Sequence, residues 1–415
     1  MACLIGNPVL HHTNDYLCKE FFMTHTEYEL VALIGNVIFG KPLPQDFAVE
    51  DLRRLTVLAL NQDVGHIVYK GLDANGLITD RSDPATEKLY ALYMKALYRL
   101  TVLENEIKRI RAVLDGHGID YMLLKGAVLR GFYPEPWMRI SADIDLLVRS
   151  VETAEDVCRI LAEELLYKQV NGEADHDRTV LAPGGFHVEI HFSLGTRGCK
   201  AMTVLGTVWE KHAVRESEQG SGYRIDDDFF YYYHIYHAAR HFSNGGCGIK
   251  TLLDETVLGA PRETSPALRE MLSETGLTVF RDTISELARR WFGSYDTPLD
   301  VDRSDDLVEQ TGLYILEGGM FGGGHYIKAV VARKGNRFVY FFQRLFPSVA
   351  ELEPFYPSLK KTRLTLPFCW IHRFFAKGIA KGEIKNGLRK DVRERVSDTE
   401  TIKDIRSLFD KLELR

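Results

Sequence analysis

The segment 141–148 constrains the fold of this chain more than any other. Its apolar side chains fall at every second position, which predicts a strand with one buried face: Ile144, Leu146 and Val148. Asp143 and Asp145 then share the opposite face. Two neighbouring carboxylates repel each other unless a cation lies between them, and hard oxygen ligands suit magnesium. The pair predicts metal-assisted phosphoryl or nucleotidyl transfer; two exposed acids on an edge strand are the alternative.

A second segment, 186–192, alternates without a break. One face is apolar, and the other carries a carboxylate between two imidazoles: His187, Glu189 and His191. If this strand lies beside the Asp-x-Asp strand, Glu189 becomes a third carboxylate near the same metal. Two-metal chemistry often uses such a trio. The alternative is an antiparallel strand with one solvated face.

The residues before the Asp pair indicate phosphate binding. Residues 119–124 form a candidate buried strand, and Lys125-Gly126-Ala127 opens a short helical run that ends near Tyr133. A glycine at a helix start presents free N–H groups to an anion, and Lys125 and Arg139 would add positive charge. An ordinary turn glycine is the alternative.

Four segments together resemble the uncharacterised nucleotidyltransferase family of the polymerase-β-like superfamily: 123–127, 133–134, 139–148 and 188–191. The resemblance implies an α/β (α+β) core with a small mixed sheet, flanked by N- and C-terminal helical domains. It implies catalytic and metal-binding roles for Asp143, Asp145 and Glu189. It also implies a set of nucleotide-binding residues: Lys125, Gly126, Ala127, Arg139, Ser141, His237, His241 and Asp254. Three features depart from the superfamily pattern. Ala127 replaces a small hydroxyl residue, the gap from Gly126 to Asp143 is longer, and the third acid is Glu rather than Asp.

The rest of the chain reads as mainly helical and divides into three regions: an N-terminal helical region (1–85), the nucleotidyltransferase core (86–225) and a C-terminal helical domain (226–415). Apolar spacing predicts a long helix over 85–117 and another over 151–168 with Ser150 as its N-cap. Asp226 to Asp228 suit a helix start. Glycines in 318–324 suit a flexible connector.

The helix that is expected to start at 226–228 carries three histidines at positions i, i+3 and i+7: His234, His237 and His241. With Asp254 they are expected to line a nucleotide or acceptor pocket, or else to pack between helices. Two other functions stay open. A metal-dependent phosphohydrolase would combine His176-Asp177 with His237 and Asp254, and a non-catalytic nucleotide-binding protein would keep the fold alone.

Composition adds limits to partners and compartment. The net charge of −6 gives no reason to expect nucleic acid. Six scattered cysteines indicate neither a zinc site nor a disulfide framework, so a cytoplasmic location fits best. No signal peptide or membrane-spanning stretch is expected. The segment 360–395 holds eleven Lys or Arg against three acids, which makes contact with a membrane surface a weak alternative to a solvated face.

The predicted reaction moves an NMP group from an NTP to a hydroxyl acceptor, with release of pyrophosphate. Mg²⁺ is the expected cofactor and Mn²⁺ the alternative. The sequence does not select the acceptor, which could be a sugar, a small metabolite, an antibiotic, a protein side chain or an RNA end.

Overall fold

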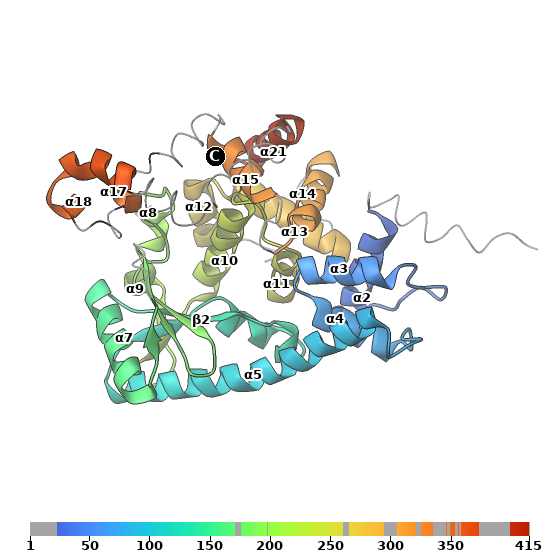
Figure 1. Cartoon of the computed structure of the whole chain (residues 1–415), viewed down its shortest axis with the longest axis horizontal. Helices are drawn as coiled ribbons and strands as arrows, with labels where there is room; N and C mark the ends of the chain where they lie inside the picture. Colours follow the sequence, from blue (N-terminus) through green and yellow to red (C-terminus); the bar gives the residue numbers. More distant parts are fainter. Residues whose placement is uncertain are drawn as a thin grey trace, which may run out of the picture.

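A seven-stranded mixed sheet forms the centre of the structure (Figure 1). This computed structural model describes residues 23–414 except for 171–175, 197, 260–264, 294–304, 321–324, 335–345, 347–348, 353–355, 357 and 373–398. The strand order is β3-β4-β5-β2-β1-β7-β6. The strands are β1 (Tyr121–Leu123), β2 (Asp143–Leu147), β3 (Lys168–Gln169), β4 (Asp177–Leu181), β5 (His187–His191), β6 (Ala213–Arg215) and β7 (Gly222–Ile225).

Strands β2 and β5 lie side by side and run parallel. β1 pairs with β2, and β4 with β5, in antiparallel fashion. The turn at 183–185 joins β4 to β5 as a hairpin. Strand β5 is thus antiparallel to β4, as the alternative for this segment had it, and parallel to the Asp-x-Asp strand β2 on its other side.

Helices α5 (Pro84–Gly116) and α7 (Val151–Leu165) cover one face of the sheet (Figure 1). Both were expected, and their first turns explain where they start. Asp83 accepts a hydrogen bond from the amide of Ala85, and Ser150 accepts one from Thr153. Between these helices and the sheet lies a buried apolar core that contains the predicted inner face of β2 and β5: Ile144, Leu146, Val148, Phe186, Val188 and Ile190.

The opposite face of the sheet meets a larger core built mainly by helices. They are α2 (His25–Phe39), α3 (Leu52–Asn61), α4 (Gly65–Ala74), α10 (Asp227–Phe242), α11 (Lys250–Leu258), α12 (Pro266–Thr275), α13 (Thr278–Phe292), α14 (Asp305–Gly318), α15 (His325–Lys334) and α21 (Thr399–Lys411). Asp226 caps α10 as expected, by accepting from the amide of Phe229. This single core includes residues from both terminal regions, and the boundaries at 85 and 225 stay a prediction.

Shorter helices complete the described part of the chain: α6 (Gly126–Leu129), α8 (Met202–Leu205), α9 (Val208–Lys211), α17 (Val349–Leu352) and α18 (Ser358–Lys361), with 3-10 turns η1 (Arg130–Phe132), η2 (Pro136–Met138) and η3 (Arg363–Thr365). Among the described helices, none has both the length and the apolar character needed to cross a bilayer. Residues 321–324 and most of the basic segment 360–395 lie outside the described residues, so the expectations for them are untested.

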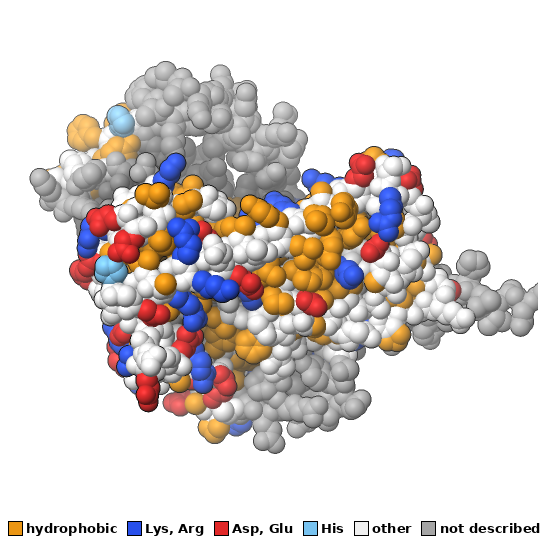
Figure 2. Space-filling model, turned by 90° about the horizontal axis from the view of Figure 1, so that it is seen from below, with side chains coloured by type: hydrophobic (Ala, Val, Ile, Leu, Met, Phe, Trp, Pro, Cys, Tyr) orange, Lys and Arg blue, Asp and Glu red, His pale blue; other side chains and the backbone are white. Residues whose placement is uncertain are grey.

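The lower face of the molecule carries a broad area of apolar side chains, seen in Figure 2. Part of it comes from α5, where three exposed side chains recur every fourth residue: Tyr90, Met94 and Tyr98. This spacing places them on one side of the helix.

Candidate active site

The register of β2 and β5 brings the predicted carboxylates together. Asp145 lies directly opposite Glu189 on the neighbouring parallel strand, and Asp143 precedes Asp145 by two residues on the same face. That face is turned away from the core under α5 and α7. The Asp145 carboxylate is almost fully buried, whereas that of Glu189 is about one-third exposed. The sheet therefore presents an acidic cluster that is open on the Glu189 side.

A lysine already bridges two of these acids. The Nζ of Lys125 lies 2.5 Å from Oδ1 of Asp145 and 4.0 Å from Oε2 of Glu189. The backbone of Lys125 has φ +45° and ψ −122°, a conformation that costs a non-glycine residue about 1–3 kcal/mol. The turn after β1 holds this strained residue where its ammonium group faces the carboxylates.

His191, which sequence reasoning did not select as a site residue, completes the cluster. Its Nε2 lies 2.9 Å from Oδ1 of Asp145 and 3.4 Å from Oε2 of Glu189. These three side chains can offer ligand atoms within 4.8 Å of one another. The alternation of 186–192 did place His191 on the face of Glu189; only the strand pairing shows that it reaches Asp145.

The two aspartates have opposite electrostatic environments. Desolvation, together with the charges of Asp145 and Glu189, raises the pKa of Asp143 to about 6. Burial also opposes ionisation of Asp145, but the charge of Lys125 and the hydrogen bond from His191 outweigh it and hold its pKa well below the usual range. Asp145 is thus compensated by the protein, whereas Asp143 forms no ion pair with a described residue and gains only a longer-range interaction with Lys125.

The glycine turn is closely packed against the start of β2. A Cβ on Gly126 would lie only 1.9 Å from Oγ of Ser141, so no larger residue fits without movement. The expectation of several free amides at this helix start is corrected, because the N–H groups of Ala127 and Val128 already donate to Leu124 and Lys125 carbonyls. The short helix α6 leaves fewer N–H groups for an anion than its sequence indicates.

Helix α10 contributes an aromatic and imidazole wall beside Lys125. Tyr233 is buried, and its hydroxyl interacts electrostatically with Lys125, Asp145 and Glu189. Nε2 of His237 lies 3.1 Å from Nε2 of His241. Burial and the charge of Lys125 lower the pKa of both imidazoles. This environment favours the neutral form of both imidazoles. Tyr233 was missed, although its i, i+4, i+8 spacing with these histidines was visible.

Asp254 is bonded to Arg139 and Tyr133 rather than to the histidines with which the sequence grouped it. Its carboxylate accepts hydrogen bonds from Nε and Nη2 of Arg139, at 2.8 and 2.9 Å, and from the hydroxyl of Tyr133 at 2.7 Å. Such a bidentate pair fixes the guanidinium plane. Asp254 therefore positions Arg139, which lies near the glycine turn.

The phosphohydrolase alternative would combine His176 and Asp177 with His237 and Asp254. His176 precedes β4, Asp177 begins it, and both lie beside His191, with which they could hold a cation. Asp254 is instead bonded to Arg139. Here His176 and Asp177 adjoin the acidic cluster at the sheet.

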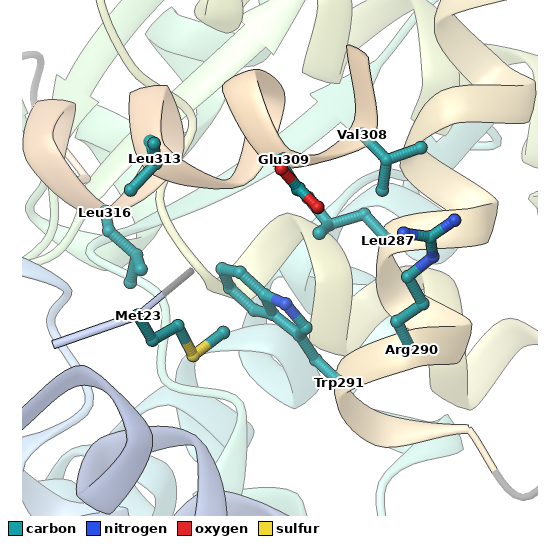
Figure 3. Close-up of a pocket in the computed structure, with 8 residues that line it drawn as sticks. All are labelled: Met23, Leu287, Arg290, Trp291, Val308, Glu309, Leu313 and Leu316. Carbon is teal, nitrogen blue, oxygen red and sulfur yellow. The ribbon is translucent and has the colours of Figure 1, made fainter. Parts of the chain in front are cut away.

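A mainly apolar recess lies elsewhere (Figure 3). It lies between α13, α14 and Met23, which comes two residues before α2. Trp291 and Leu287 face Val308 and Leu313 across it. None of its lining residues comes from β2, β5 or α10, so it is no part of the acidic cluster.

Comparison with known proteins agrees with the geometry. A family model described as an uncharacterised nucleotidyltransferase matches residues 49–293, more than half of the chain. The chain belongs to this nucleotidyltransferase family. No significant match was found among curated proteins or among solved structures. The matched region contains all seven strands and extends to the end of α13.

Membership of the nucleotidyltransferase family confirms the resemblance seen in the sequence. The donor set also fits a divalent cation: two carboxylates and an imidazole converge, with Asp143 adjacent. Carboxylates suit Mg²⁺ and Mn²⁺, whereas the imidazole is a softer ligand that favours Mn²⁺ over Mg²⁺. The wider polymerase-β-like placement stays a prediction.

Proposed function

We propose that the protein transfers a nucleoside monophosphate from an NTP to an acceptor hydroxyl. The acceptor oxygen loses its proton and forms a bond to the α-phosphorus. The bond from this phosphorus to the bridging oxygen breaks, and pyrophosphate leaves with the electron pair. The observation that supports this reaction most is the register of Asp145 and Glu189 on two parallel strands, with Asp143 on the same face.

Asp143, Asp145 and Glu189 would hold Mg²⁺, or Mn²⁺ in its place. Such ions neutralise phosphate charge and lower the pKa of a bound hydroxyl when present. The carboxylate of Glu189 is more exposed than that of Asp145, and it is therefore better placed to take the proton from the acceptor hydroxyl. Its carboxylate can serve either as a ligand or as a base.

Lys125 keeps Asp145 ionised and carries positive charge to the place where phosphates would lie. Gly126, Ala127 and Ser141 would form the adjoining wall of the nucleotide site. Arg139, held by Asp254, would contribute a rigid cation. His237 and His241, both uncharged, suit hydrogen bonds to the base, sugar or acceptor rather than charge pairing with phosphate.

The decisive experiment supplies the full chain with each of the four NTPs, labelled at the α- or γ-phosphate, with MgCl₂ or MnCl₂ and a metabolite extract. Transfer predicts α-label in a new product and γ-label in pyrophosphate. Release of γ-label as free phosphate would instead support a phosphohydrolase. NTP binding without turnover, in all extracts and with both metals, would support a non-catalytic nucleotide-binding protein.

A further inference from the structure

A second, strongly basic cavity lies behind the glycine turn. Helix α5, the turn η2 and the residues 139–141 that lead into β2 provide most of its walls. Three arginines and a serine line it together with apolar side chains: Arg99, Arg130, Arg139 and Ser141, with Leu100, Leu103, Pro136, Trp137 and Ile140. No acidic residue is among these described lining residues.

The three guanidinium groups differ in how they are neutralised. Asp254 pairs with Arg139 through two hydrogen bonds. Arg99 donates only to the carbonyls of Ser141 and Ala142, at 3.3 and 3.2 Å. Arg130 donates through Nε to the carbonyl of Gly126 at 2.9 Å. Two of the three charges therefore have no carboxylate bonded to them in the described structure.

Arg130 and Ser141 also leave hydrogen-bonding atoms unused. Both terminal nitrogens of Arg130 and the Oγ of Ser141 are buried and have no hydrogen-bond partner among the described residues. The Arg130 side chain is only 6% exposed. A buried charge without a partner is costly, because it loses hydration without compensation. Burial and the nearby Arg139 charge lower the pKa of Arg130 to about 10, and Glu104 opposes them only in part.

We propose that this cavity binds a phosphate-type oxyanion, with Arg130 and Ser141 as direct donors and Arg99 as a second cation. A planar guanidinium fork matches two oxygens of a phosphate group. The site shares a wall with the glycine turn, because Ser141 packs directly on Gly126. The molecule that carries this anion is inferred from the proposed function: the anion is the pyrophosphate end of the NTP or an anionic group on the acceptor.

The test measures binding of inorganic phosphate and of pyrophosphate to the full chain by calorimetry, without nucleotide or metal. Sodium chloride at equal ionic strength is the reference. We expect a saturable signal that chloride does not give. Arg99→Gln should weaken it about tenfold or more, because a charged donor is lost. Arg111→Gln removes a cation from the same helix outside the cavity and should leave it unchanged.

Arg130→Lys keeps the charge but removes the fork, and it should also weaken phosphate binding in a protein that stays folded. Glu104→Gln tests the competing explanation, in which the charge of Arg130 is neutralised by Glu104 and needs no bound anion. If Glu104 were the true partner of Arg130, this variant would lose stability, and phosphate would have no effect on either protein. That result, or equal weakening in Arg99→Gln and Arg111→Gln, would overturn the proposal.

Competition separates the two sources of the anion. Pyrophosphate that binds more tightly than phosphate and displaces an NTP would assign the cavity to the nucleotide. Phosphate that binds together with an NTP would assign it to the acceptor. Binding is measured without turnover, so the two proposals can fail separately. If the protein binds the oxyanion but has no transferase activity, the proposed function is refuted and the oxyanion site stands.

Discussion

Replacing Asp143 by Asn should stabilise the metal-free protein and abolish its stabilisation by metal. Asp143 is the acid that desolvation and its two acidic neighbours keep from ionising easily. Asn has nearly the same shape but carries no charge. The substitution therefore removes a repulsion in the metal-free state and a ligand in the metal-bound state, and these two effects have opposite signs.

The magnitude follows from the pKa of Asp143, which folding raises from 3.8 to about 6. A difference of about two pKa units corresponds to about 3 kcal/mol of unfolding free energy. Because the raised pKa favours the protonated form, the wild-type protein loses this stability as the pH rises from about 4 to about 6. Partial exposure of the side chain screens the charges, so we expect a gain of about 1–3 kcal/mol for Asp143→Asn above pH 7.

Thermal unfolding measures both effects. Without metal at pH 8, Asp143→Asn should melt above the wild type, and at pH 4 the difference should vanish. With MgCl₂ or MnCl₂ at 100 times the dissociation constant, the wild type should gain about 2.7 kcal/mol. The variant should gain little, so metal should shift the stability difference by about 2.7 kcal/mol in favour of the wild type.

Asp145→Asn is the matched control, since it changes the same residue type two positions along the strand. Here the loss removes the closer partner of Lys125 and His191 and leaves them only the more distant carboxylate of Glu189. Removing one member of a buried ion pair costs about 3–5 kcal/mol, so this variant should be destabilised without metal. Equal destabilisation by both substitutions, or metal stabilisation that survives Asp143→Asn, would refute the assignment of Asp143 as the uncompensated ligand.

Three further predictions concern catalysis and binding. Glu189→Gln should retain binding of a non-hydrolysable NTP in calorimetry while turnover falls about 10²-fold or more; unchanged turnover would make Glu189 an ordinary strand residue. His237→Ala should weaken NTP or acceptor binding and leave the metal requirement in place. A changed metal requirement would contradict the role of this imidazole as a hydrogen-bonding group that holds no metal. Arg139→Lys should lower NTP affinity about tenfold, because Lys cannot keep the bidentate bond to Asp254; an affinity equal to the wild type would remove Arg139 from the nucleotide site.

The sequence could predict the acidic face of the sheet because a strand has a period of two residues. Alternation alone places Asp143 with Asp145 and Glu189 with His191. The same regularity predicts the apolar face beneath, and capping residues predict the starts of α7 and α10. These features depend on local chemistry, which a single sequence states directly.

The partners across the site could not be predicted in this way, because they depend on strand order and helix packing. Nothing local to Asp254 indicates that it bonds Arg139, which is 115 residues away. The neutral state of His237 likewise depends on burial and on Lys125, which comes from a distant strand end. The membership of His191 in the acidic cluster required the parallel pairing of β2 with β5.

The metal-free site is best understood as a partly neutralised charge cluster. Lys125 and His191 compensate Asp145 and approach Glu189, but neither forms a hydrogen bond to Asp143 in the described structure. A cation entering the cluster would therefore gain most from Asp143, whose charge is the least stabilised. Lys125 can then remain with Asp145, because a carboxylate has two oxygens and several acceptor positions. This division of roles explains why two aspartates on the same strand face have opposite pKa shifts, and why their Asn variants should respond oppositely to removal of metal.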